Sequence, residues 1–346
     1  MRTICLVFGF CVFISTAFAD PPSTAPATGG RHWALSIRDP YLRGLGPDNI
    51  WQAGRSVRLN RLEVYLDDNL ACPYIYEKDG APYRIDTPEA RKTLLEKLTK
   101  EHFTIGCFMI LPRLVVDGSE DKAVLQRVRK VAEVVSEFGN AIIMLPIDIR
   151  GVKENEPPTD QEFVARGKAF VRQLDRIAAE TKAQIVIENL GKYWNRPEIL
   201  EPVLRESTPD SVGLLLDITN MYWYGFPLDR IYELAQQFAP YVRYVHCKNI
   251  RYPEDQRQKQ RPPGWEYAKY ADPIGTGDIN FNRIMEILVK AGYVGDLCNE
   301  DDSLPHYDAA GKRKALLEDV DFFRQWFKWN RPQSFSRPAN TQPTDK

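Results

Sequence analysis

Residues 183–189 read AQIVIEN, a short apolar run that ends in a carboxylate and an amide. Three later stretches have the same form: residues 212–217 read VGLLLD, residues 242–246 read VRYVH, and residues 294–300 read VGDLCNE. Runs of this length, rich in Val, Ile and Leu, are typical of the buried strands of a parallel sheet. In α/β barrels the chemistry lies at the carboxyl ends of such strands. The sequence therefore predicts four polar side chains at the ends of four successive strands: Glu188, Asp217, His246 and Glu300.

Strand-like and helix-like segments alternate along the chain. Strands are expected at residues 33–37, 59–66, 103–111, 141–147, 183–188, 212–217, 242–246 and 294–300. Helices are expected at residues 88–100, 121–138, 160–181, 197–205, 227–238, 281–291 and 315–329. Glu188, Asp217 and His246 are spaced 29 residues apart, which indicates one repeated strand–helix unit. Eight such units predict an α/β protein with the fold of a single-domain (β/α)8 TIM barrel.

An open, doubly wound sheet is the alternative arrangement of the same elements. It would need a glycine-rich phosphate loop directly after the first strand. The residues there are Arg38-Asp39-Pro40-Tyr41, which do not form such a loop. The barrel is therefore the favoured prediction.

The two ends of the chain differ in composition from the rest. Residues 1–19 combine Arg2, an apolar stretch too short to span a bilayer, and an Ala-Phe-Ala cleavage pattern, which are the features of a secretory signal peptide. We expect export to the periplasm or out of the cell, without a stable membrane anchor. Residues 20–31 and 331–346 are polar and contain proline, which predicts a disordered spacer and a disordered tail around a barrel at residues 32–330.

The composition narrows the choice of partner. The net charge of −1 and the pI of about 6.5 do not favour nucleic acid or an anionic membrane surface. A small molecule is the expected partner, and the oligomeric state stays open. Without a CxxC pair a cysteine zinc site is not expected, and disulfides between the cysteines that follow the signal peptide also stay open: Cys72, Cys107, Cys247 and Cys298.

Three carboxylates and one imidazole form a mixed oxygen and nitrogen ligand set. Divalent ions such as Mn²⁺, Mg²⁺, Co²⁺ or Zn²⁺ suit such a set. We therefore expect one divalent metal ion bound by Glu188, Asp217, His246 and Glu300. The alternative is that each residue only caps its strand or pairs with a loop arginine, but four in one register favour the metal. Glu63, on the second strand, either points into the barrel mouth or pairs with an arginine of the core.

Several motifs, taken in order, resemble one known family. They are Ile187-Glu188-Asn189, Leu216-Asp217, Val245-His246-Cys247-Lys248-Asn249, the stretch IGTGDINF at residues 274–281, and Asn299-Glu300. Together they resemble the xylose isomerase-like TIM barrel superfamily, and more narrowly its sugar phosphate isomerase/epimerase branch, with ketose 3-epimerases and inosose dehydratases as relatives. The resemblance covers roughly residues 33–329. It implies a sugar or a sugar derivative as the small-molecule substrate.

The resemblance also implies the roles of the four ligands. In the epimerases two glutamates bind the metal and exchange a proton, from opposite faces, with the carbon next to a carbonyl. Carried over, Glu188 and Glu300 are both metal ligands and the catalytic acid/base pair, whereas Asp217 and His246 are ligands only. The metal would polarise the carbonyl and stabilise an enediolate.

Four further residues are expected to contact the substrate. Lys248 follows the histidine by two positions, so both side chains face the same side of a strand. Asn220 stands where epimerases often carry a histidine, and Trp194 where ketose epimerases carry a second glutamate, and both departures weaken the case for ketose epimerisation proper. Arg251 lies in residues 249–278, a long polar segment with aromatic residues that we expect to be a mobile lid.

These features lead to three hypotheses of function. The first is a metal-dependent isomerase or epimerase of a sugar or sugar derivative, working through an enediolate with two metal-bound glutamates as the acid/base pair. The second is an exported lyase or hydratase of keto-sugars or inososes on the same site, which Trp194 and Asn220 favour slightly. The third is a non-catalytic carbohydrate-binding barrel, against which the intact ligand set argues.

Overall fold

A computed structural model describes residues 33–78, 80–112, 114–115, 118–139, 141–147, 149–150, 152 and 157–329. The predicted signal peptide at residues 1–19, spacer at residues 20–31 and tail at residues 331–346 lie outside the described residues and stay predictions. All described residues belong to one compact unit. No helix in the described part of the chain has both the length and the apolar character needed to cross a membrane.

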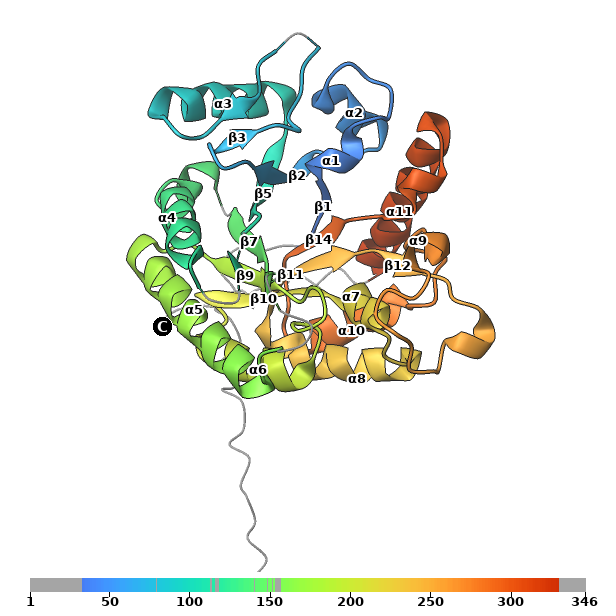
Figure 1. Ribbon diagram of the computed structural model, residues 1–346. Helices are drawn as coiled ribbons and strands as arrows, with labels where there is room; N and C mark the ends of the chain where they lie inside the picture. Colours follow the sequence, from blue (N-terminus) through green and yellow to red (C-terminus); the bar gives the residue numbers. More distant parts are fainter. Residues whose placement is uncertain are drawn as a thin grey trace, which may run out of the picture. The chain divides into compact units, whose positions relative to one another are not determined.

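Eight parallel strands close into a barrel (Figure 1). They are β1 Ala34–Arg38, β2 Arg61–Leu66, β5 Thr104–Ile110, β7 Ile142–Pro146, β9 Ile185–Glu188, β10 Val212–Asp217, β11 Val242–Cys247 and β14 Asp296–Asn299. Their order around the barrel follows the chain, and β14 pairs with β1 to close the ring. The predicted (β/α)8 TIM barrel is confirmed, and each predicted strand is found within a few residues of its expected bounds.

Helices run along the outside of the strands, as Figure 1 shows. The long ones are α3 Pro88–Glu101, α4 Asp121–Ala132, α5 Asp160–Thr181, α6 Pro197–Leu204, α8 Leu228–Phe238, α10 Phe281–Lys290 and α11 Ala309–Trp329. The helix expected over residues 121–138 is divided, because α4 ends at Ala132 and a separate 3-10 turn, η1 Val135–Phe138, follows it. The last helix begins at Ala309 rather than at residue 315.

Shorter elements fill the connections. They are α1 Asp39–Leu42, α2 Ile50–Ser56, β3 Ala71–Cys72 paired with β4 Tyr83–Arg84, β6 Leu114–Val115 paired with β8 Ile149–Arg150, α7 Ile218–Tyr224, η2 Ala239–Tyr241 and η4 Leu304–His306. The patterns in the sequence predicted none of them, because pieces this short show no clear period of hydrophobic residues.

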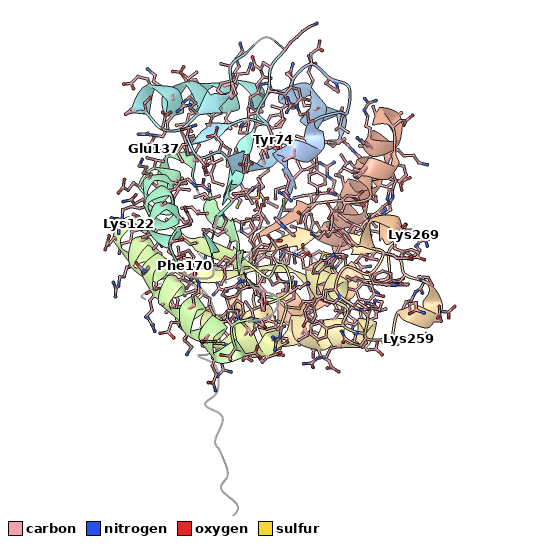
Figure 2. All side chains as sticks on the ribbon, viewed as in Figure 1. Tyr74, Lys122, Glu137, Phe170, Lys259 and Lys269 are labelled. Carbon is pink, nitrogen blue, oxygen red and sulfur yellow. The ribbon has the colours of Figure 1, made fainter. Side chains whose placement is uncertain are left out.

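The segment of residues 249–278, expected as a long loop, contains several short elements. They are β12 Asn249–Ile250, η3 Glu254–Gln256, α9 Tyr267–Tyr270 and β13 Ala271–Asp272, and β12 pairs antiparallel with β13. Its outer side is polar: Lys259 and Lys269, both labelled in Figure 2, are 56% and 62% exposed.

Buried contacts fasten the 249–278 segment to the barrel. The guanidinium of Arg261 is buried between the rings of Tyr222 and Tyr252, 4.5 and 4.4 Å from their centroids. Asp278 accepts hydrogen bonds from the Tyr222 hydroxyl at 2.9 Å and from the Tyr252 backbone N–H at 2.8 Å. The part played by this segment as a mobile lid stays a prediction.

Part of the inside of the barrel below its mouth is apolar. Its side chains form a cluster separate from the larger core between strands and helices: Cys107, Met109, Ile142, Met144, Val186, Leu215, Tyr244 and Cys298. Alternate residues of a strand face the same side. Four members of this cluster each precede a predicted ligand by two positions. Val186 precedes Glu188, Leu215 precedes Asp217, Tyr244 precedes His246 and Cys298 precedes Glu300. The pleat of the strands thus places the predicted ligands above an apolar floor.

Candidate metal centre

The predicted ligands meet at one point of the barrel mouth. All four are buried, and one ligand atom of each lies within 4.8 Å of the others: Glu188, Asp217, His246 and Glu300. Nδ1 of His246 lies 2.9 Å from Oε2 of Glu300 and 3.5 Å from Oε1 of Glu188. Ligand atoms about 2.1 Å from a metal ion lie at most about 4.2 Å apart, so a divalent ion requires only a slight contraction of this group.

The donor atoms also have the chemistry that a cation requires. Nδ1 of His246 makes no hydrogen bond to any described residue, and Oδ2 of Asp217 accepts none. Oδ2 of Asp217 instead lies 2.8 Å from the ammonium of Lys248. A buried nitrogen without a hydrogen bond is costly, and a bound cation would satisfy Nδ1 of His246, while Oδ2 of Asp217 would contact the cation in addition to the ammonium of Lys248. The residues therefore fit a divalent metal ion.

Asp217 owes its orientation to the helix that follows it. It is the last residue of β10 and also the N-cap of α7, where its Oδ1 accepts the backbone N–H groups of Thr219 at 3.0 Å and Asn220 at 3.1 Å. Aspartate is among the preferred N-cap residues because its side chain satisfies such free N–H groups. Only Oδ2 remains for a cation.

Two asparagines hold the ends of β9 and β10 together. Asn189 accepts the backbone N–H of Asp217 at 2.9 Å and donates to its carbonyl at 2.7 Å. Asn220 donates to Oε1 of Glu188 at 3.1 Å and to the carbonyl of Asn189 at 2.9 Å. Asn220, expected to contact the substrate, is thus brought to the cluster, where it orients Glu188.

Glu63 is a fourth carboxylate of the site. It is 1% exposed, and its Oε2 lies 2.8 Å from Nε2 of His246 while its Oε1 lies 3.2 Å from Nε of Arg38. Both roles that the sequence left open are therefore realised, since Glu63 reaches the mouth and also pairs with an arginine. When His246 is neutral, a hydrogen on Nε2 directed at Glu63 leaves its lone pair on Nδ1, the nitrogen that faces the other ligands.

A second group with ligand-like spacing lies on the other side of the same histidine. It consists of Glu63, His246 and Cys298. The hydrogen bond to Glu63 already engages Nε2 of His246. Burial raises the pKa of the Cys298 thiol to about 12, which disfavours the thiolate that a metal needs. The group of four is therefore the better cation site.

Two cations lie among the carboxylates. Nζ of Lys248 lies 2.8 Å from Oδ2 of Asp217 and 3.3 Å from Oε2 of Glu300. The guanidinium of Arg38 forms an ion pair with Oε1 of Glu300. Sequence reasoning missed Arg38, although closure of the barrel provides the signal: β1 and β14 are neighbours, so Arg38 and Glu300 occur at adjacent strand ends.

The charges of the cluster shift its protonation equilibria. Burial alone would raise the pKa of Glu300, but the positive charges of Lys248 and His246 lower it well below its ordinary value. Burial alone would lower the pKa of His246, but Glu63 and Glu300 raise it well above its ordinary value. Burial raises the pKa of Asp217 to about 7 against the opposing charge of Lys248. Glu300 is therefore kept ionised, the form that a ligand and a base both require.

The model of a family described as xylose isomerase-like TIM barrel matches residues 62–326, which is more than half of the chain. The chain belongs to the xylose isomerase-like TIM barrel family. The resemblance of the sequence to the xylose isomerase-like TIM barrel superfamily is thereby confirmed. A comparison with curated protein sequences gave no match.

Several solved structures share the fold. A xylose isomerase domain protein from Planctomyces limnophilus is 18% identical, with 87% of this chain and 99% of that chain covered and a TM-score of 0.58. An IOLI protein with a binding zinc atom is 15% identical, with coverages of 85% and 99% and a TM-score of 0.62. A D-tagatose 3-epimerase-like protein is 16% identical, with coverages of 84% and 98% and a TM-score of 0.55. At these identities the likeness shows the common barrel.

Two expected substrate contacts of this xylose isomerase-like barrel make their described contacts with residues other than the ligands. Trp194 is 3% exposed and its ring packs against α5, where a side-chain carbon added at Gly167 would collide with it. The guanidinium of Arg251 is half exposed and contacts the carbonyl of Thr276 at 3.0 Å and the carboxylate of Asp272 at 3.0 Å, both in its own segment. Among the described residues neither side chain makes a hydrogen bond or an ion pair with the four ligands, so their predicted role gains no support from these positions.

Three residues that the sequence did not single out meet beside Lys248. Asp302, just after β14, accepts hydrogen bonds from the hydroxyls of Tyr41 on α1 and Tyr267 on α9, one on each carboxylate oxygen. Its Oδ2 lies 3.6 Å from Nζ of Lys248. No regular spacing connects these residues in the sequence, so only the folded loops reveal the group.

Proposed function

We propose that the protein is a metal-dependent isomerase or epimerase that acts on a sugar or a sugar derivative. The observation that carries the proposal is the convergence of two glutamates, an aspartate and a histidine, with ligand-like spacing, at the mouth of a xylose isomerase-like barrel. The names of two solved relatives, a D-tagatose 3-epimerase-like protein and a protein with a binding zinc atom, agree with this proposal.

The four ligands divide into two roles. A divalent ion held by them would polarise a substrate carbonyl and stabilise negative charge on its oxygen. Glu188 ends β9 and Glu300 follows β14, and β10 and β11 separate these strands in the barrel. Their carboxylates therefore approach the centre from different sides, and a carbon placed between them would face one on each side. One glutamate removes the proton from that carbon, and the other returns a proton to the opposite face of the enediolate.

Lys248 is the expected donor to the substrate. Its side chain is 7% exposed, and its ammonium lies 3.3 Å from Oε2 of Glu300, beside one member of the acid/base pair. A buried ammonium in this place can donate a hydrogen bond to a substrate hydroxyl or carbonyl oxygen next to the reacting carbon.

A lyase or hydratase of keto-sugars is the second candidate, and the position of Lys248 favours it. Elimination begins with the same removal of a proton next to the carbonyl, but the neighbouring hydroxyl must then leave as water. An ammonium beside the acid/base pair is placed to protonate that leaving hydroxyl, a step that epimerisation does not need.

Metal analysis tests the metal centre. After chelation and reloading, we expect the wild type to hold one divalent ion per chain and His246→Ala to hold substantially less. The matched control is His306→Ala, because His306 is an exposed residue that is not one of the four ligands. Equal metal content in the wild type and His246→Ala would overturn the proposed centre.

Proton exchange in D₂O separates the functions. The metal-loaded protein is incubated with a panel of free ketoses, inososes and keto-sugars and followed by NMR. Deuterium at the carbon next to the carbonyl, with an altered configuration, supports epimerisation, and loss of water to an unsaturated product supports the lyase. Sugar binding without exchange of any proton would favour the third hypothesis, a carbohydrate-binding barrel.

We also propose that the chain is exported through residues 1–19. The support is the sequence pattern of that stretch alone. Mass spectrometry of the protein recovered from the periplasm or the medium should find a chain that begins at Asp20. A protein that retains Met1 and stays inside the cell would contradict export.

A further inference from the structure

The ammonium of Lys248 contacts two of the carboxylates that would bind the proposed metal ion. Its ammonium lies 2.8 Å from Oδ2 of Asp217 and 3.3 Å from Oε2 of Glu300. An ammonium and a divalent ion that share two carboxylates compete for their negative charge, and they repel each other. Metal binding at this site therefore depends on what else holds Lys248.

Asp302 is a third carboxylate near Lys248 that lies outside the metal group. Its Oδ2 lies 3.6 Å from Nζ of Lys248, and it is not one of the four residues with ligand-like spacing. Its two oxygens accept the hydroxyls of Tyr41 and Tyr267. Rotation of the carboxylate toward the metal group would break both hydrogen bonds, so Asp302 is held facing the lysine.

The backbone of Lys248 is held as well. Its carbonyl accepts the hydroxyl of Thr219, on the helix that follows β10. The root of the lysine side chain is thus fixed at the end of β11, and its ammonium stays between the metal group and Asp302.

We propose that Asp302 is a positioning residue of the metal centre. In the structure the ammonium of Lys248 lies closer to Asp217 than to Asp302. When a metal ion binds, Asp302 offers this ammonium a carboxylate outside the ligand group and so frees Asp217 and Glu300 for the ion. The inference rests on the proposed function, because it takes the four ligands to bind a divalent ion. The competing explanation is that Asp302 only anchors the 249–278 segment through Tyr267, in which case its effect on metal binding would not depend on Lys248.

A double-mutant cycle tests the proposal with the metal alone. The dissociation constants of Mn²⁺ and Zn²⁺ are measured by titration calorimetry for the wild type, Asp302→Asn, Lys248→Met and the double variant. We expect Asp302→Asn to weaken binding at least about tenfold, equal to about 1.4 kcal/mol. Lys248→Met should bind at least as tightly as the wild type, and in that background Asp302→Asn should weaken binding less than about threefold.

Two controls accompany the cycle. Tyr41→Phe combined with Tyr267→Phe frees Asp302 without removing its charge, and should weaken metal binding in the same direction as Asp302→Asn but by less. Asp272→Asn removes a carboxylate that pairs with Arg251, in the same segment, and should leave the dissociation constant unchanged. Thermal unfolding of each metal-free variant identifies any that fails to fold, and the tyrosine pair then carries the test.

Two results would overturn the positioning role. One is no loss of affinity in Asp302→Asn. The other is the same loss with and without Lys248, which would be a general effect of removing a negative charge. Failure of the wild type to bind either ion would instead overturn the proposed metal centre and this inference with it, so the two failures are distinguishable.

Discussion

Replacing Glu63 by glutamine is expected to weaken metal binding while the barrel stays folded. Glu63 accepts from Nε2 of His246 at 2.8 Å with one oxygen and pairs with Nε of Arg38 at 3.2 Å with the other. Glutamine has one acceptor oxygen and one NH₂ group, so it can serve only one of these two donors. If its oxygen faces the histidine, its NH₂ group faces the arginine, and the reverse arrangement leaves His246 without an acceptor.

The size of this effect follows from the position of Glu63 behind a ligand. Carboxylates that orient a ligating histidine typically contribute about 10- to 100-fold to metal affinity. The expected loss in Glu63→Gln is therefore about 1.4 to 2.7 kcal/mol of binding free energy. Added metal should also raise the thermal unfolding midpoint of Glu63→Gln by less than that of the wild type. The reason is that stabilisation by a ligand grows with the ratio of its concentration to its dissociation constant.

Titration calorimetry with Mn²⁺ and Zn²⁺ measures the loss, and Asp296→Asn is the matched control. Asp296 is also a buried carboxylate of the barrel paired with an arginine, Arg61, at 2.6 Å, and it is not in the metal group. Both variants replace a buried carboxylate by an amide, but only Glu63→Gln should change the dissociation constant. An unchanged constant in Glu63→Gln, or an equal loss in both variants, would refute the reasoning.

Further predictions concern the glutamates and the 249–278 segment. Glu188→Gln and Glu300→Gln should each keep the fold and most of the metal but lose turnover by at least about 10²-fold. One of the two variants should still exchange the substrate proton with solvent. Steady-state rates near the wild-type value in both variants would exclude the two-carboxylate mechanism. Burial alone would raise the pKa of Glu300, but Lys248 and the other nearby cations lower it well below the ordinary 4.5. The ionised carboxylate therefore stabilises the folded protein at pH values above the pKa of Glu300 in the unfolded chain. This stabilisation is lost as the pH falls from that value toward the lower pKa of the folded protein. In urea unfolding of the metal-free protein, the difference in unfolding free energy between the wild type and Glu300→Gln should therefore shrink below about pH 5, and a constant difference would contradict this assignment. Gly225→Ala should destabilise the protein and speed proteolysis of the 249–278 segment. Gly225 has a φ of +112°, and an added Cβ would lie 1.9 Å from a backbone oxygen of that segment. An unchanged cleavage rate would argue against the contact at Gly225 as an anchor of the segment.

The barrel and the meeting of its ligands could be predicted because each depends on local pattern. A run such as residues 185–188 is buried on both faces, so its composition alone identifies a strand. Parallel strands in sequence order bring their carboxyl ends to one mouth, which is why Glu188, Asp217 and His246 could be assigned to one site. The spacing of ligand atoms, within 4.8 Å, agrees with that assignment.

The partners of the ligands were not predicted: the pairing of Arg38 with Glu300 follows from closure of the barrel but was overlooked, and the other contacts depend on loop conformation. Arg38 and Glu300 are 262 residues apart in the sequence, and only the pairing of β1 with β14 brings them together. Asp302 meets Tyr41 and Tyr267 through loops whose paths no hydrophobic period encodes. Trp194 was assigned by analogy with a relative's glutamate, and its role as a substrate contact stays a prediction, since the described contact of its ring is with α5.

Asp217 links the folding of one helix to the occupancy of the site. One of its oxygens holds the first turn of α7 and the other faces the cation position. Because a single carboxylate serves both, a cation that fixes its orientation should also slow opening of that turn, and fraying of the turn should lower the affinity by the same factor. Hydrogen exchange at the backbone amides of Thr219 and Asn220 should then become slower when metal is bound, so its rate measures occupancy of the site without any substrate. A glutamate could not replace this ligand, since its longer side chain does not cap the helix as an aspartate does.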